Sequence, residues 1–148
     1  MDINYSVEQT EKMLAEAYLL ARDHYKEVES KADKVDFNLD LNYMSQLVEA
    51  GLIYSVMARD GEKLIGYFCC MLCPDFMTQL PLAKEVGIYV DPAYRGQGVY
   101  KEMLQLAEEA AADRDAYCLI LAFKEGHDTG EAIELGYGVT ETLYQKLL

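Results

Sequence analysis

The pattern of hydrophobic and polar positions changes its period near the middle of the chain. Before Gly51, apolar residues recur every three to four positions, which is typical of amphipathic helices. After Gly51, short apolar runs are separated by turn residues, which is typical of β-strands. Helical and strand patterns then alternate, so the sequence predicts an α/β fold with a mixed sheet.

Two helices are predicted in the first third of the chain. "SVEQ" has the form of a capping box, so Ser6 is the predicted N-cap of a helix whose apolar stripe runs from Leu14 to Val28. After a polar connection, Asp40 is the predicted cap of a second helix, which Gly51 ends.

A hairpin follows the helices. The strand-like runs "LIYSVMAR" and "LIGYFCCMLC" flank the turn residues "DGEK", and this arrangement predicts two antiparallel strands.

The second half of the chain predicts a strand–helix–strand unit. "EVGIYV" precedes a helix from about Val99 to Ala112, and the apolar run "YCLILAF" comes next, as a fully buried strand. Two strands joined by such a crossover are parallel. A short helix around 128–135 and a last strand, "VTETLYQKL", are predicted to close the fold.

Length and composition limit the class of protein. With 148 residues, of which 51% are apolar, the chain is expected to form a single folded domain over 1–148. It has no run of 18 apolar residues and begins with a polar, acidic segment, so we expect a cytoplasmic protein that does not enter a membrane. Its four cysteines lie in apolar runs and are predicted to be reduced core residues.

The charge is strongly acidic, with 26 Asp and Glu against 13 Lys and Arg, for a formal net charge of −13. Nucleic acid is therefore not an expected partner, because binding to its backbone needs a basic surface. A cationic partner or substrate would be attracted, although the same charge also serves solubility alone.

The segment "RGQG" lies where the strand "EVGIYV" passes into the helix that begins near Val99. Free N–H groups at a helix N-terminus bind anions, above all phosphates. Glycines at 96 and 98 allow an oxygen to approach the backbone without meeting a Cβ atom. The spacing matches neither a P-loop nor a dinucleotide-binding fingerprint, and a simple tight turn is the alternative.

The longer stretch "VGIYVDPAYRGQGVYKEML" resembles the acetyl-CoA motif of the GNAT superfamily of N-acetyltransferases. The matching residues are Val90, Pro92, Tyr94, Arg95 and Gly98, whereas Tyr100 replaces a small residue of the family pattern. The resemblance implies that acetyl-CoA is the co-substrate. It implies a pyrophosphate loop made of Arg95, Gly96, Gln97, Gly98, Val99 and Tyr100. It also implies that the pantetheine arm pairs with the strand backbone of Ile88, Tyr89 and Val90.

The resemblance covers nearly the whole chain. It implies a GNAT-like, mostly antiparallel sheet with one parallel strand–helix–strand unit, flanked by helices, with a weak first strand around Ile3 to Tyr5. Stretches such as "HDTGEAIELGYG" are similar, more narrowly, to GNAT proteins encoded by phages and prophages.

The catalytic residues that the family often uses are not at their usual positions. The position of a common glutamate holds Lys84, and that of a common tyrosine acid holds Ala132. Glu85 is adjacent to Lys84 but faces the other side of a strand. Tyr137 or Tyr144 could supply the missing acid.

The only two histidines are the other candidates for proton transfer. His24 lies at the edge of the first helix's apolar stripe, where it is either a packed residue or a base. His127 follows the predicted parallel strand, where it is either a solvated loop residue or part of a site at the strand ends. Of the two histidines, His127 is the one predicted to lie closest to the chemistry.

A metal site is not expected. The single C-x-x-C, Cys70 to Cys73, lies inside a predicted strand, and a structural zinc site needs four ligands. The mixed segment "CPDFMTQLPL" is either an ordinary loop or part of the acceptor wall.

The sequence and the resemblance therefore predict transfer of an acetyl group from acetyl-CoA to an amine, either on a cationic small molecule or on a protein. The alternative is a protein that keeps the fold but has lost turnover, such as a phage-encoded inhibitor of a host protein. A homodimer is compatible with either.

Overall fold

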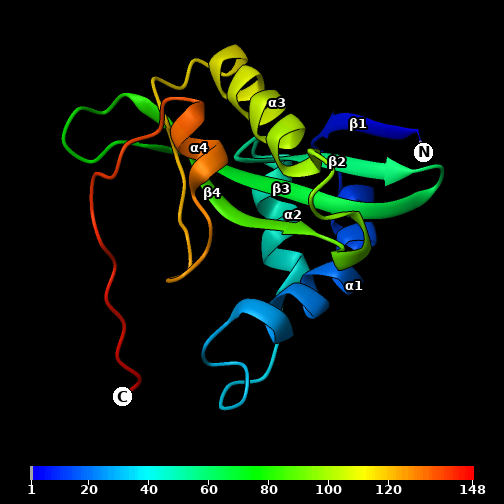
Figure 1. Cartoon of the computed structure of the whole chain (residues 1–148). Helices are drawn as coiled ribbons and strands as arrows, with labels where there is room; N and C mark the ends of the chain where they lie inside the picture. Colours follow the sequence, from blue (N-terminus) through cyan, green and yellow to red (C-terminus); the bar gives the residue numbers. More distant parts are fainter. Residues whose placement is uncertain (1) are drawn as a thin grey trace.

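The computed structural model describes residues 2–148 and contains one five-stranded sheet with helices on both faces (Figure 1). In chain order the elements are β1 (Ile3–Glu8), α1 (Glu11–Val28), α2 (Leu41–Glu49), β2 (Ile53–Asp60), β3 (Lys63–Pro74), β4 (Pro81–Val90), the short 3-10 helix η1 (Pro92–Tyr94), α3 (Val99–Asp113), β5 (Leu119–Ile120) and α4 (Gly130–Glu134).

The strands follow one another across the sheet in the order β1-β2-β3-β4-β5. The first four are antiparallel neighbours, and β4 pairs with β5 in parallel. This arrangement confirms the predicted mixed α/β sheet and its parallel pair.

The parallel pair is much shorter than expected. Ladder pairing joins only Ala83 to Leu119 and Lys84 to Ile120, and both β5 residues are only partly buried. The prediction of a fully buried strand over 117–123 was therefore wrong. An apolar run indicates burial, but it does not tell whether the backbone keeps a strand partner along its whole length.

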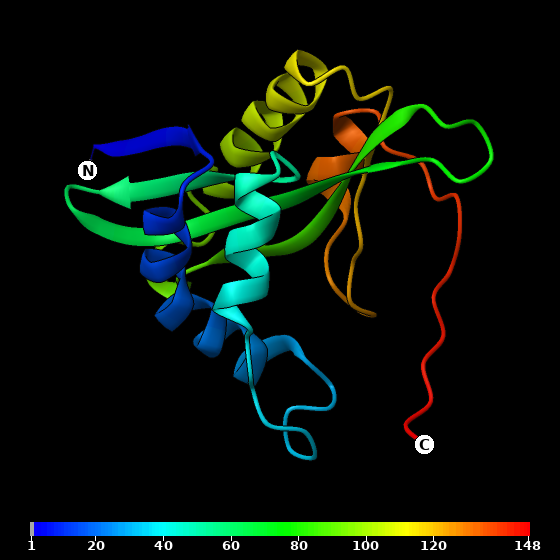
Figure 2. The same ribbon diagram turned by 180° about the vertical axis from the view of Figure 1, so that it is seen from behind.

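Helices α1 and α2 cover one face of the sheet and α3 covers the other (Figures 1 and 2). On the α3 side, Phe68 and Met103 lie in a fully buried cluster, and the Tyr54 hydroxyl donates a hydrogen bond to the carbonyl of Ala107 at 3.0 Å. On the other side, Met13 of α1 and Tyr67 of β3 belong to a second core cluster. The sheet therefore separates two cores.

The first helix starts later than its sequence signal indicated. Ser6 lies within β1, and Thr10 is the N-cap of α1, where its side chain accepts a hydrogen bond from the Met13 N–H at 3.3 Å. The expected first strand is thus present and longer, since residues 3–8 pair with β2. Asp40 caps α2 as predicted, by accepting from the Tyr43 N–H at 2.9 Å.

Arg59 of β2 fixes the first helix to the sheet. Its guanidinium contacts Glu8 of β1 and Glu16 of α1, both at 2.6 Å. All three side chains are about three-quarters buried. One cation therefore neutralises two carboxylates and joins β1, β2 and α1.

The chain after α4 forms no strand. Residues 138–148 have no regular secondary structure and run away from the body of the molecule (Figure 1). Their apolar side chains are exposed, with Val139 at 93% and Tyr144 at 94%. The predicted last strand is therefore wrong for this chain, where the two-residue β5 offers almost no edge to pair with.

Candidate active site

The loop between β4 and α3 has the backbone geometry of an anion site. Gly96 and Gly98 have φ angles of 74° and 81°, in the left-handed region that favours glycine. Gly98 is the N-cap of α3. Within the described residues, no hydrogen bond is made by the backbone N–H groups of positions 96–101. Six consecutive amides are therefore free at the N-terminus of a 15-residue helix.

A hollow of about 120 Å³ lies against these amides. It is lined by Val90, Tyr94, Arg95, Gly96, Gly98, Val99, Tyr100 and Glu131. The structure therefore brings together most of the residues that the sequence assigned to the pyrophosphate loop.

Arg95 is held beside the loop by other protein groups. Its Nε donates a hydrogen bond to the carbonyl of Val90 at 2.9 Å, and its guanidinium pairs with Glu27 of α1 at 2.5 Å. Tyr89 also donates to Glu27, at 2.6 Å, and its ring lies 5.3 Å from the guanidinium carbon. Because Glu27 already neutralises Arg95, the free amides are the principal anion donors of this loop.

The Tyr100 side chain packs against the protein core and does not extend into solvent. Its ring packs against the core on the α3 side, and its buried hydroxyl has no hydrogen-bond partner within residues 2–148. Burial raises the pKa of Tyr100 to about 12. The large side chain at this position therefore takes up core space beneath the loop.

Strands β4 and β5 separate after two paired positions, and the gap between them is called the fork below. After Lys84 no residue of β4 pairs with β5, so the outer edge of β4 from 85 to 90 is free within the described chain. Cys69 pairs with Gly87 and Cys70 with Glu85, which leaves Val86 as a bulge.

Glu85 lies at the base of this fork. Its carboxylate accepts a hydrogen bond from the Ala122 N–H at 3.1 Å, across the gap that opens between the strands. Burial raises the pKa of Glu85 to about 7, despite the opposing effects of that hydrogen bond and of two lysines. A carboxyl group with this pKa can give or accept a proton near neutral pH.

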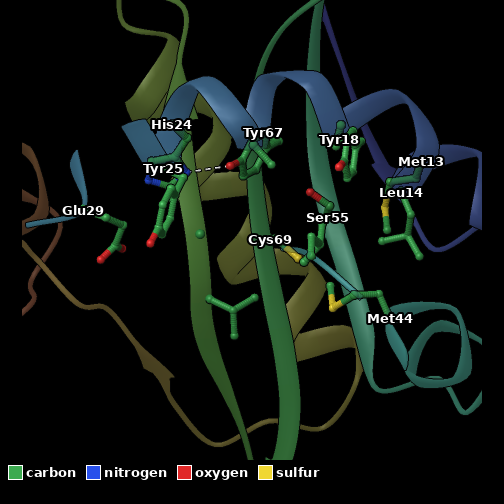
Figure 3. Close-up of a pocket in the computed structure, with 15 residues that line it drawn as sticks. Met13, Leu14, Tyr18, His24, Tyr25, Glu29, Met44, Ser55, Tyr67 and Cys69 are labelled. Carbon is green, nitrogen blue, oxygen red and sulfur yellow. Dashed lines mark hydrogen bonds between the residues drawn. The ribbon is translucent and has the colours of Figure 1, made fainter. Parts of the chain in front are cut away.

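A pocket of about 200 Å³ lies on the other face of β4, between the sheet, α1 and α2 (Figure 3). Its lining residues are Met13, Leu14, Ala17, Tyr18, Ala21, His24, Tyr25, Glu29, Leu39, Met44, Ser55, Tyr67, Cys69, Val86 and Gly87. Most of them are apolar, and the polar groups gather at a few points.

His24 and Tyr67 form the main polar pair of this pocket. Nδ1 of His24 lies 2.6 Å from the Tyr67 hydroxyl oxygen (Figure 3). The His24 ring also stacks on Tyr89, with centroids 5.1 Å apart. Burial lowers the pKa of His24, so the imidazole is neutral at pH 7. Burial also raises the pKa of Tyr67, so the phenol keeps its proton.

Gly87 leaves space in front of this pair. A Cβ atom at this position would lie 3.4 Å from Cε2 of Tyr67 and 3.8 Å from Cε1 of His24. The absent side chain gives the pocket access to the β4 backbone beside the bulge.

The two histidines have different surroundings. His24 lines the pocket, whereas His127 is exposed in the turn between β5 and α4, where its backbone N–H donates to the Lys124 carbonyl at 3.1 Å. No side-chain hydrogen bond of His127 is made within the described residues. The prediction for His127 therefore rests on the sequence alone.

Other residues singled out from the sequence lie away from the pocket. Phe76 and Met77, at the tip of the β3–β4 hairpin, are 89% and 85% exposed, so this loop does not form a wall of the pocket. Ala132 is buried and Lys84 is exposed. Tyr137 packs against the α3-side core and Tyr144 is exposed.

Three residues of the site were not found from the sequence: Glu27, Tyr67 and Gly87. Tyr67 lies inside an apolar strand run, where a tyrosine indicates core packing. Glu27 is one of many acidic residues on α1, and nothing in the sequence distinguishes it. For Gly87, its position in the middle of a strand is a signal, because such glycines often mark a bulge or a close approach.

The family model described as "Acetyltransferase (GNAT) family" matches residues 13–133, which is most of the chain. The chain belongs to this family. No curated protein sequence matches it.

Solved structures share the fold at low sequence identity. An aminoglycoside acetyltransferase from an uncultured soil sample is 16% identical with a TM-score of 0.75, and the match covers 100% of this chain and 98% of that one. A ribosomal-protein-alanine N-acetyltransferase from Brucella melitensis is 18% identical, with a TM-score of 0.71 and 99% of each chain covered. A predicted acetyltransferase from Clostridium acetobutylicum, solved with acetyl-CoA, is 15% identical with a TM-score of 0.74, over 99% and 96% of the two chains.

Membrane-spanning helices and metal-binding clusters are both absent from the described residues. No helix among residues 2–148 has the length and apolar content needed to cross a membrane. No three His, Cys, Asp or Glu side chains in the same range are grouped closely enough to hold a metal ion. The four cysteines are free thiols, but only Cys70 is buried and the other three are partly exposed, so the prediction of four core residues was wrong in part.

The raised pKa of Glu85 predicts a pH-dependent contribution to stability. The folded protein binds this proton more tightly than the unfolded chain, whose glutamate has a pKa of 4.5. The contribution is therefore fully present below about pH 4.5 and is lost as the pH rises through about 7. Between pH 4 and pH 8, we expect the free energy of unfolding to fall by about 2–3 kcal/mol more in the wild type than in Glu85→Gln.

Urea unfolding of the wild type and of Glu85→Gln between pH 4 and pH 8 measures this difference. The amide keeps an acceptor for the Ala122 N–H, so the hydrogen bond survives the change. Parallel stability curves for the two proteins would show that the Glu85 carboxyl is not perturbed.

Proposed function

We propose that this protein is an N-acetyltransferase that moves an acetyl group from acetyl-CoA to a primary amine. The main support is the row of six backbone N–H groups at 96–101 that make no hydrogen bond within the described residues. This row lies next to the unpaired edge of β4. A pyrophosphate fits those amides, and the pantetheine arm fits the free edge at Ile88, Tyr89 and Val90. The acceptor would then enter from the pocket on the α1 side.

His24 and Tyr67 are proposed to take the proton of the amine. Acetyl-CoA supplies an acetyl thioester, whose carbon–sulfur bond breaks as the carbon–nitrogen bond forms. The amine proton passes to the Tyr67 oxygen as the Tyr67 hydroxyl proton passes to Nδ1 of His24. The 2.6 Å separation allows that second transfer, and the lowered pKa of His24 keeps its nitrogen available at neutral pH.

Glu85 is proposed to return a proton to the leaving sulfur. With its pKa near 7, much of this carboxyl is protonated at neutral pH, and it lies at the fork beside the free β4 edge. The pKa of His24 is lowered below the usual histidine value, and the pKa of Glu85 is raised above the usual glutamate value. Such opposite shifts let one residue act as a base and the other as an acid at the same pH. His127 remains a sequence-based candidate for the same chemistry.

A protein that binds acetyl-CoA but does not turn over is the alternative. It is favoured by Lys84 and Ala132, which occupy the usual positions of a glutamate and a tyrosine in the family. An acetyl-transfer assay on a panel of amines, with mass spectrometry of the products, separates the two functions. A phage origin and a cytoplasmic location stay predictions.

Cofactor binding is tested by Gly98→Glu. The new carboxylate would occupy the anion site and repel the pyrophosphate, so we expect the variant to lose acetyl-CoA binding in calorimetry. Gly51→Glu is the matched control, because Gly51 has a φ of 74° and lies before β2, far along the strands from the loop. If the wild type does not bind acetyl-CoA, or if Gly98→Glu binds it equally well, the assignment is wrong.

Proton transfer is tested by substituting both histidines. We expect His24→Gln to lower kcat by about 10² to 10⁴, and Tyr67→Phe to do the same, with little change in acetyl-CoA affinity. The double variant should be no slower than the slower single variant, because the two residues act as one unit. His127→Gln is expected to stay within about threefold of the wild type. A large loss in His127→Gln alone would assign the base to the β5–α4 turn.

A homodimer is proposed from the exposed apolar segment at 138–148. Leu143 is 75% exposed and Tyr144 is 94% exposed, and such side chains commonly mark a contact with another chain. Light scattering is expected to give twice the 16.8 kDa mass of one chain, and Leu143→Asp with Tyr144→Asp is expected to give the single mass. A monomeric wild type would contradict the dimer.

A further inference from the structure

The net charge and the pocket point to different acceptors. The charge of −13 favours a cationic substrate, which a polyamine or an aminoglycoside would satisfy. Among the described residues that line the pocket, however, Glu29 is the one carboxylate. Glu29 is already paired with Lys124 at 2.7 Å, so little negative charge is left for a second or third ammonium group.

The walls of the pocket are suited to an apolar group. Met13, Leu14 and Met44 lie toward one end in Figure 3, and Ala17 and Ala21 of α1 add small side chains. Methionine side chains adapt to the shape of a ligand and make favourable contacts with aromatic rings. An unpaired ammonium group buried against such walls would be costly, because the lining offers it no free carboxylate in place of its water.

The size of the pocket limits the acceptor further. Its volume of about 200 Å³ is only slightly larger than the roughly 150 Å³ cavity known to hold benzene in another protein. A single ring or a short branched chain fills this space, so at most one ring of a two-ring or three-ring sugar could enter it.

The polar pair defines the orientation of such a ligand. In Figure 3, His24 and Tyr67 lie between the methionine end and Glu29. They also border the space that Gly87 leaves open beside the β4 backbone. An amine joined by a short linker to an apolar body at the methionine end would therefore reach His24 and Tyr67.

We propose that the acceptor is a small primary monoamine with a compact apolar body, such as an arylalkylamine or a branched alkylamine, bound with its body between α1, α2 and the sheet and its amine at His24 and Tyr67. This proposal rests on the proposed acetyltransferase function. It assigns specificity to the apolar walls, and it assigns the acidic surface no role in selecting the acceptor.

Calorimetry on the full chain saturated with CoA tests the proposal. The ligands are phenethylamine, isopentylamine, spermidine, an aminoglycoside and a short peptide with an N-terminal leucine. We expect the two apolar monoamines to bind at least about tenfold more tightly than the others, with affinities that change little between low and high salt. Tighter binding of spermidine or the aminoglycoside, or of the peptide, would overturn the proposal.

Filling the pocket from α1 provides the matched variants. We expect Ala21→Leu to weaken phenethylamine binding at least about tenfold, because the added atoms fill the pocket one turn of α1 before His24, while acetyl-CoA affinity is unchanged. Ala15→Leu, on the exposed face of the same helix, is the control and should bind like the wild type. Ala17→Leu repeats the test one turn earlier if Ala21→Leu folds poorly. Unchanged phenethylamine binding in a folded filling variant would overturn the location.

The outcomes separate this proposal from the one on which it rests. If the wild type does not bind acetyl-CoA, the acetyltransferase function is refuted. Acetyl-CoA binding together with a preference for polycations would refute only the acceptor class. Tight binding of apolar monoamines without acetylated product would support the acceptor pocket and refute turnover.

Discussion

The parting of β4 from β5 after Lys84 is the constraint on which the candidate site depends. Had the parallel ladder continued, the β4 edge from 85 to 90 would be satisfied by β5, and no ligand could pair with it. The parting instead leaves backbone donors and acceptors free at the strand end that leads into the glycine loop. It also explains why Glu85 is partly buried and yet bonded to Ala122, because its side chain spans the gap that the missing strand pairs leave.

The loop and the two cores hold this fork in place. Arg95 is bonded to the Val90 carbonyl and paired with Glu27, so the strand end, the loop and the last turns of α1 form one unit. Arg59 joins the beginning of α1 to β1 and β2 in the same way. Helix α1 is thus fixed near both ends, and the pocket beneath it has a defined wall. This arrangement places His24 of α1 against Tyr67 of β3.

Most of the fold could be predicted from periodicity and turn residues, whereas the site could be predicted only in part. The hairpin and both long helices follow from local patterns that the structure preserves. The extent of β5 and the fate of 138–148 do not, because strand pairing is a non-local property. The anion loop was predicted because glycines at fixed spacing determine backbone conformation. Tyr67 and the Val86 bulge were missed, since register and side-chain pairing across strands leave no mark in one sequence.

The net charge of the protein and the lining of the pocket act on a ligand in different ways. A charge of −13 is spread over a surface and acts through water, where salt screens it within about 10 Å. In a pocket the ligand touches the wall. Removing water from an ammonium group there costs more free energy than its attraction to distant carboxylates supplies. Glu29, the nearest carboxylate of the wall, is held by Lys124 and adds little. The side chains at the apolar end, and not the overall charge, therefore set the chemistry of what this pocket can hold.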